Sequence, residues 1–87
     1  MKVSKIEIIP VRPHQGLIGF ATIALDDDLL LSSIAIHSKL DGKRFRLTYP
    51  TRGHGKSALT LFHPITPELS REIEKSIFDK AHRILQY

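Results

Sequence analysis

The sequence predicts an α+β fold, in which an antiparallel β-sheet of about five strands carries one C-terminal α-helix. Three observations support this prediction: apolar segments separated by turn residues over the first two thirds of the chain, an Asp-Gly pair at 41–42, and a helix-start signal at Thr66 and Pro67 that precedes an apolar stripe. The 87 residues fit one domain, spanning 1–87, and leave no room for a second hydrophobic core.

Three strands are predicted before the Asp-Gly pair, over residues 2–12, 17–25 and 29–38. The first strand meets Pro10 and Pro13, which cannot donate to a strand ladder, so we expect an edge strand or one that bends at its end. Gln15-Gly16 and the three aspartates at 26–28 are turn residues, and they separate the strands.

A hairpin is predicted around positions 41–42, because Asp-Gly supplies the positive φ angles of a two-residue type I′ turn. The strand that follows, over 43–49, alternates apolar and polar side chains. Its apolar side chains are expected to face the core, so Arg44 and Arg46 are expected to face outward.

The rest of the chain predicts a polar loop over 50–56, a short return strand over 57–63 and then the helix. Thr66 is the expected N-cap, Pro67 the first helical residue and Glu68 a first-turn acid. Apolar residues then recur mainly at four-residue spacing, which predicts one amphipathic helix to the end of the chain. The stripe consists of Leu69, Ile73, Ile77, Ala81 and Ile84.

A homodimer is predicted from a mismatch between the sheet and its cover. One helix can cover only one face of the sheet, whereas the strands over 17–25 and 29–38 carry apolar residues on both faces. Uncovered apolar surface calls for a partner, and the commonest solution for a homo-oligomer is a two-fold dimer.

The amino-acid composition excludes several kinds of functional site. The chain has no cysteine, which excludes a disulfide framework, a thiolate zinc site and a cysteine nucleophile. No apolar run is long enough to span a bilayer, and the N-terminus has no signal-peptide pattern. We therefore expect a cytoplasmic protein with no membrane partner.

The sequence offers no convincing catalytic or cofactor motif. Gly-Lys-Ser at 55–57 resembles the end of a P-loop, but Pro50 stands where that motif needs its first glycine. The histidines are scattered, without an i,i+4 pair on one helix or an acid cluster that would complete a metal site. We expect no enzyme activity, no metal, no cofactor and no small-molecule substrate; a small hydrolase centred on His63 is the weakest alternative.

The charge distribution indicates a binding surface. The formal net charge is +4, from 13 Lys and Arg against 9 Asp and Glu, and residues 42–65 contain no acid. Arginine and lysine form charge-assisted hydrogen bonds with phosphate oxygens, so this window is the candidate nucleic-acid contact. A solvated basic face kept for solubility is the alternative reading. The candidate residues are Lys43, Arg44, Arg46, Arg52 and Lys56.

Taken in order, several stretches resemble the stage V sporulation protein G (SpoVG, septation protein) family. They are 1–6 (MKVSKI), 21–26 (ATIALD), 45–52 (FRLTYPTR) and 63–65 (HPI), followed by Arg71 and Ile73 in the helix. The resemblance covers nearly the whole chain, and it depends on the order and spacing of these stretches rather than on any one of them.

The resemblance implies a small dimeric α+β fold and site-preferring nucleic-acid binding that regulates genes. It also implies that the basic loop after the proline contacts DNA, and this contact falls on Arg52. Departures from the family pattern include Arg52-Gly53, where two adjacent basic residues are common, and Ser32-Ser33, where relatives often have His-Asp.

Two functions from different classes follow. The first is a non-enzymatic regulator that binds DNA, with RNA left open as a ligand, and acts in gene regulation linked to septation or sporulation. The second is a protein-interaction module of the cell-division or sporulation machinery, with the basic face as its docking surface. Salt-sensitive binding to a labelled duplex distinguishes them.

Overall fold

The computed structural model describes residues 1–39, 44–53 and 59–85, and it confirms the α+β class. Long strands fill the first half of the chain and the helix fills its last quarter, as the apolar patterns predict. In chain order the elements are β1 (Val3–His14), β2 (Leu17–Leu25), β3 (Leu29–Ser38), β4 (Phe45–Thr48), β5 (Thr51–Arg52), β6 (Leu59–Thr60) and α1 (Pro67–Leu85).

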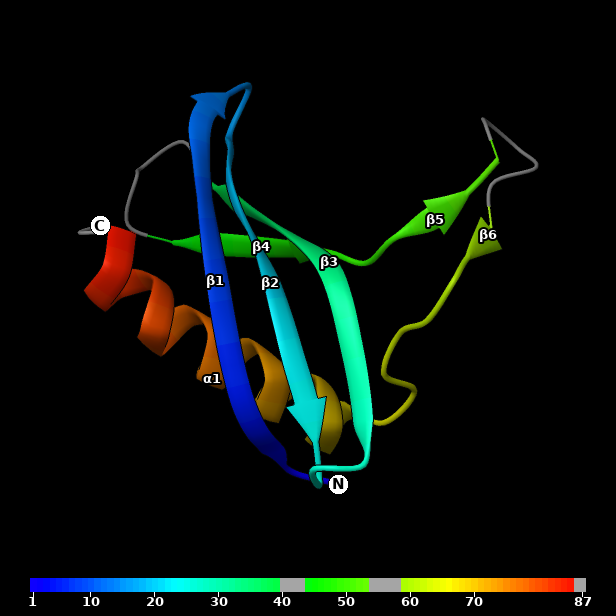
Figure 1. The fold of residues 1–87 in the computed structure, drawn as a ribbon. Helices are drawn as coiled ribbons and strands as arrows, with labels where there is room; N and C mark the ends of the chain where they lie inside the picture. The colour runs from blue at the N-terminus through cyan, green and yellow to red at the C-terminus, as the bar shows by residue number, and fades with distance from the viewer. Residues whose placement is uncertain (40–43, 54–58, 86–87) are drawn as a thin grey trace.

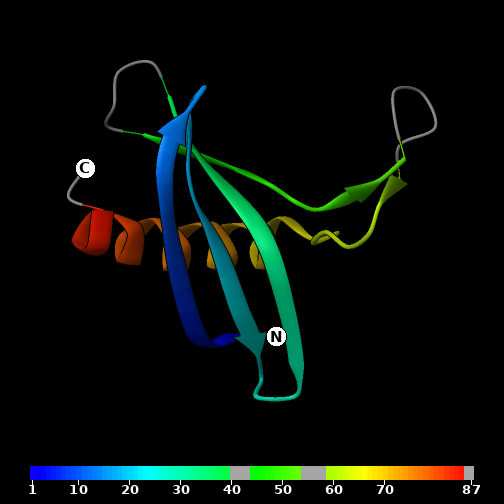
Figure 2. The same ribbon diagram turned by 45° about the horizontal axis from the view of Figure 1, so that its top comes forward.

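The first four strands form one antiparallel sheet in the order β1-β2-β3-β4, so each strand pairs with its neighbour in sequence (Figure 1). Ala21 lies opposite Ile8 of β1 and opposite Ile34 of β3, and Ile36 lies opposite Leu47 of β4. These paired residues point to one face of the sheet. The helix α1 crosses that face, behind β1, β2 and β3 in both Figure 1 and Figure 2.

The core lies between this face and α1. The side chains with no exposed area include Ile23, Ile34 and Ile36 from the sheet and Ile73 and Ile77 from the helix. Their spacing of two along strands and four along the helix is what places them all on the facing surfaces. The predicted helical stripe is confirmed through Ala81 and fails at its last member, because Ile84 is 43% exposed.

The helix begins where the capping residues predict. The Thr66 hydroxyl accepts a hydrogen bond from the Leu69 N–H at 3.2 Å, and the Thr66 carbonyl accepts one from the Ser70 N–H at 3.1 Å. The side-chain bond satisfies a backbone donor that has no partner within the first turn. Thr66 is therefore the N-cap, and Pro67 is the first helical residue.

The first strand extends beyond its predicted end at residue 12 and reaches His14. Its pairing with β2 shifts between Pro10 and His14, so the ladder is irregular where the prolines lie. The prolines are tolerated because β1 is an edge strand of the sheet, where a missing donor breaks bonds on one side only.

The predicted single sheet of about five strands is wrong, because the strands are divided between two sheets. In the described part of the chain, the main sheet has four strands, and β5 pairs with β6 in a separate two-stranded ribbon. The expected loop over 50–56 begins as β5, and the expected strand over 57–63 is described as strand only at Leu59–Thr60. Pro50, which has no N–H to donate, lies between the end of β4 at Thr48 and the start of β5 at Thr51.

The ribbon stands away from the sheet and helix in Figures 1 and 2. Its register places Thr51 opposite Thr60 and Arg52 opposite Leu59, and the Leu61 N–H donates to the Pro50 carbonyl at 2.8 Å. The turn predicted at 41–42, which joins β3 to β4, lies outside the described residues.

The face of the sheet opposite α1 has no covering element among the described residues. Ile9 of β1 and Leu30 of β3 belong to this face and are 55% and 68% exposed. A shallow hollow of about 400 Å³ lies on it, lined by Lys5, Glu7 and Leu30 among others. This arrangement matches the premise of the dimer prediction, which stays a prediction.

Candidate nucleic-acid interface

Two of the predicted contact residues lie on the edge strand β4 and its approach. Arg46 is in the strand and Arg44 precedes it, and both side chains are exposed. Phe45 between them is 5% exposed, so strand alternation puts Arg46 on the opposite side of β4. The Lys39 N–H donates to the Arg44 carbonyl at 2.8 Å, so a third basic residue lies beside Arg44.

The third described candidate, Arg52, lies in β5 of the ribbon and is exposed. Lys43 and Lys56, the other two predicted contacts, lie outside the described residues. The structure therefore describes three of the five predicted residues, all exposed and lying in or immediately before β4 and β5. Lys39 completes this set, which we call the basic end: Lys39, Arg44, Arg46 and Arg52.

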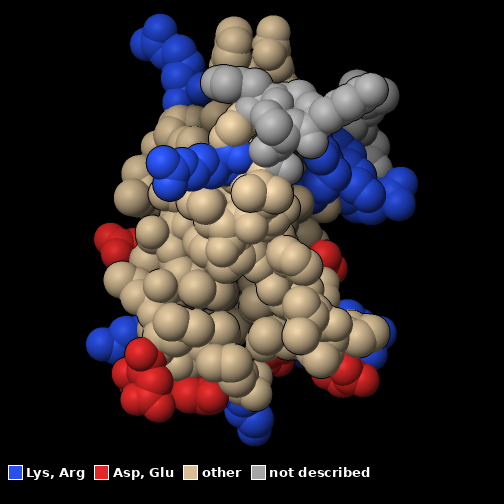
Figure 3. Space-filling model, turned by 90° about the vertical axis from the view of Figure 1, so that its right-hand side faces the viewer, with Lys and Arg blue, Asp and Glu red and all other residues tan. Residues whose placement is uncertain are grey.

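The turn at the opposite end of the molecule carries three acids. Asp26, Asp27 and Asp28 form the predicted turn between β2 and β3 and are all exposed, and the first two adopt positive φ angles of 53° and 57°. The backbone N–H of Lys2 donates to the Asp26 carboxylate at 2.9 Å. In Figure 3, Lys and Arg lie in both the upper and the lower parts, whereas Asp and Glu lie in the middle and lower parts.

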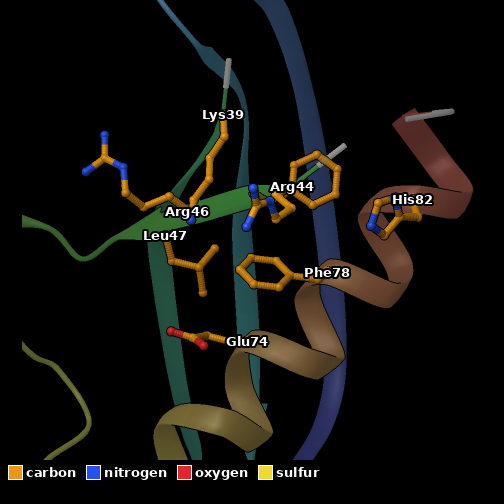
Figure 4. A pocket seen from close by; sticks show the side chains of 8 residues that line it. Lys39, Arg44, Arg46, Leu47, Glu74, Phe78 and His82 are labelled. Carbon is orange, nitrogen blue, oxygen red and sulfur yellow. The ribbon is translucent and has the colours of Figure 1, made fainter. Parts of the chain in front are cut away.

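A hollow of about 430 Å³ lies between β4 and α1 at the basic end (Figure 4). Lys39, Arg44 and Arg46 line it from the sheet side, and Glu74 and Phe78 line it from the helix. Arg44 and Arg46 come from the predicted contact window, but Lys39 precedes that window and was missed. The helix residues were missed because nothing in the sequence pairs them with β4.

Aromatic contacts fix one wall of this hollow. The Phe45 ring is 5.7 Å from the Phe78 ring and 4.6 Å from the His82 ring, measured between centroids, with tilted planes. Such distances are favourable for aromatic pairs. The half-buried Phe78 ring is therefore held by the buried Phe45 ring while part of it stays at the surface.

Two titratable groups near the basic end have shifted pKa values. Burial, and secondly the charge of Arg46 on the neighbouring strand, lower the pKa of His37. Burial, and secondly the carboxylate of Glu74, raise the pKa of Tyr49. The Tyr49 hydroxyl is buried and has no hydrogen-bond partner among the described residues.

The structure gives no support to the weaker candidate sites. His63 is exposed, and its Nδ1 atom lies 3.1 Å from the carbonyl oxygen of the adjacent Pro64, a local contact rather than a catalytic pair. No group of three or more potential metal ligands occurs in the part of the chain that the structure describes. None of the helices described there is long and apolar enough to cross a membrane. The Gly-Lys-Ser triplet at 55–57 lies outside the described residues.

The fold and the basic end define a small α+β domain with exposed basic side chains in and beside β4 and β5. No family model matches the sequence. A septation protein SpoVG from Phytoplasma australiense is 30% identical to it over 87 residues, which is 98% of this chain and 88% of the relative. The chain belongs to the SpoVG family, as the resemblance in its sequence predicts.

Proposed function

We propose that this SpoVG-family protein is a nucleic-acid-binding regulator, which binds DNA with some site preference and acts in gene regulation linked to septation or sporulation. RNA is the alternative ligand. The function needs no catalytic step and places the protein in the cytoplasm. The observation that carries the proposal is the basic end, where three predicted cations and Lys39 lie exposed in or beside β4 and β5.

Geometry favours phosphate as the partner of these side chains. Arg46 lies in β4 and Arg44 immediately before it, and both side chains are exposed. Arginine binds phosphate oxygens through a planar, two-pronged donor set. Arg52 on the ribbon extends the contact surface beyond the sheet, and the acidic turn at 26–28 lies at the other end, so that an anionic polymer meets the protein in one orientation.

We also propose that the protein acts as a homodimer. The uncovered sheet face exposes Ile9 and Leu30, and the segment from the ribbon to the helix exposes Leu59, Leu61 and Ile65 by 71%, 59% and 85%. Two apolar surfaces on one chain can cover one another when two copies associate about a two-fold axis. A dimer also presents two basic ends to the same nucleic acid.

A labelled duplex titrated with the protein at several salt concentrations tests the binding proposal. We expect the logarithm of affinity to fall linearly with the logarithm of salt concentration, because phosphate contacts release counterions. Sedimentation equilibrium of the same sample tests the dimer, for which we expect twice the chain mass of 9.9 kDa. Binding that ignores salt would contradict the first proposal, and a monomer at micromolar concentration would contradict the second.

A second function is favoured by the apolar segment after β6. Leu59, Leu61 and Ile65 are the kind of exposed apolar side chains that mark protein contacts. They support the alternative of a protein-interaction module in the division or sporulation machinery. A protein that stays monomeric, shifts neither duplex nor single strand and loses a protein partner on Leu61→Ser would fit this alternative.

A further inference from the structure

We propose that the hollow between β4 and α1 binds one unpaired nucleotide, with a preference for guanine. The inference deepens the proposed nucleic-acid function, on which it rests for the choice of ligand class. It assigns the hollow a role distinct from phosphate contacts along the outer surface, because it adds recognition of a base. The ligand is either a free nucleotide or one nucleotide of a single strand.

The shape of the hollow suits a small ligand. Its volume of about 430 Å³ falls within the range of roughly 300 to 1,000 Å³ that is usual for small-molecule sites. In Figure 4, Leu47 of β4 and Phe78 of α1 point toward one another across it. A flat base placed between them would contact an aromatic ring on one side and an aliphatic side chain on the other, the arrangement that unpaired bases favour.

The polar groups lie on two sides of this apolar wall. Lys39 and Arg44 lie at the rim above Phe78 in Figure 4, whereas Glu74 lies below it. The guanidinium of Arg46 points away from the hollow in the same view. A nucleotide has a matching arrangement: its phosphate is anionic at one end, and the edge of its base at the other end carries hydrogen-bonding groups. Lys39 and Arg44 would therefore hold the phosphate, and Glu74 would meet the base edge.

Glu74 determines which base fits. An ionised carboxylate only accepts hydrogen bonds, so it needs a base edge with adjacent donors. Guanine offers two neighbouring donors, N1–H and the exocyclic N2 amino group. Adenine and cytosine each place a ring nitrogen acceptor beside their amino donor, and uracil flanks its one N–H with carbonyl oxygens. Only guanine presents donors to both carboxylate oxygens.

The nucleotide site is tested by measuring the affinities of GMP, AMP, CMP and UMP for the full chain at low salt. We expect GMP to bind about tenfold or more tightly than the others, in line with the discrimination that a two-bond base contact provides. Glu74→Gln should remove this preference while leaving weak binding of all four. Equal affinities in the unaltered protein, or a GMP preference that survives Glu74→Gln, would overturn the proposal.

A second variant tests the stacking wall. Phe78→Leu keeps an apolar side chain and removes the aromatic face, so it should weaken GMP binding severalfold. Arg71→Ala, at an exposed helix position that does not line the hollow, is the matched surface control and should leave GMP affinity unchanged. Thermal unfolding verifies that Phe78→Leu is folded. If it is unfolded, the Glu74→Gln result alone decides.

An oligothymidylate with one central guanine, compared with plain oligothymidylate and GMP, distinguishes the two ligand sources. Tighter binding of the guanine-bearing strand than of GMP supports a single strand, and equal binding supports a free nucleotide. The proposed function can fail separately: duplex binding that is independent of salt contradicts it even when GMP is preferred. Salt-sensitive duplex binding without any base preference contradicts only the nucleotide site.

Discussion

The body of the molecule and its basic end differ in how their residues are held. In the body, Ile23, Ile34 and Ile77 have no exposed area and pack between sheet and helix. At the basic end, Arg46 and Arg52 are exposed on a four-residue edge strand and a two-residue ribbon strand. The body should therefore determine whether the protein folds, and the basic end should determine what it binds. Substitutions in the two regions are expected to separate these properties.

The largest effect is expected in the body, at Ile77. Ile77→Ala removes a side chain with no exposed area and leaves a cavity between α1 and the sheet, which should lower the free energy of unfolding by roughly 2 to 5 kcal/mol. Urea unfolding followed by circular dichroism measures this loss. Lys75→Ala, exposed on the same helix, is the control and should change little. Equal losses in both variants would mean that the buried face of α1 is assigned wrongly.

A smaller effect is expected at the start of the helix. Thr66→Ala removes the hydroxyl that accepts the Leu69 N–H, so the free energy of unfolding should fall by about 1 kcal/mol. Thr60→Ala in the exposed ribbon has no capping role and serves as the control. Nucleic-acid affinity should be the same in both variants when they are folded. A loss of affinity in Thr66→Ala would show that the two regions are not separable.

The boundary between the two regions lies at His37, which faces Arg46 across β3 and β4. Its pKa in the folded protein is below the ordinary value of 6.5, so the unfolded chain binds the proton more readily. Stability should therefore be constant above about pH 7.5 and decrease as the pH falls through 6.5. Thermal melting temperatures from pH 8 to pH 5 measure this decrease, and His37→Gln should reduce it. An unchanged slope in that variant would assign the decrease to other groups.

The smallest effect is expected at Tyr49, at the end of β4. Its hydroxyl is buried without a hydrogen-bond partner among the described residues, so Tyr49→Phe should leave stability unchanged or raise it slightly. The Tyr49 ring should keep its edge contact with Phe62, whose centroid is 6.1 Å away. Chemical unfolding is the measurement. A loss above about 1 kcal/mol would show that the hydroxyl has a partner, since that is the usual contribution of one hydrogen bond.

Much of the body could be predicted from the sequence. The bounds of β2 and β3 agree with the predicted strands over 17–25 and 29–38, because turn residues with strong local preferences separate them. The helix start could be predicted because capping depends on neighbouring residues alone. The end of β1 could not, since whether a strand tolerates Pro13 depends on its place at the edge of the sheet.

The basic end was less predictable because its geometry depends on contacts between distant segments. The chain leaves the main sheet after Thr48, and the alternation over 43–49 does not reveal that β5 then pairs with β6. Lys39 was missed since it precedes the acid-free window by three residues, although it lies beside Arg44 in space. Glu74 and Phe78 lie beside the apolar stripe of α1, and the stripe alone does not predict that these residues lie close to β4.

The central claim is that the basic end binds phosphate, and the salt dependence of duplex binding by Arg52→Ala and Arg46→Ala tests it most directly. Each variant should weaken binding to all duplexes alike and lower the salt slope by about one, because each loses one phosphate contact. Arg71→Ala removes the same charge from the helix and should change neither quantity. Identical behaviour of all three variants would contradict the claim, since the protein would then respond to its net charge and not to the basic end.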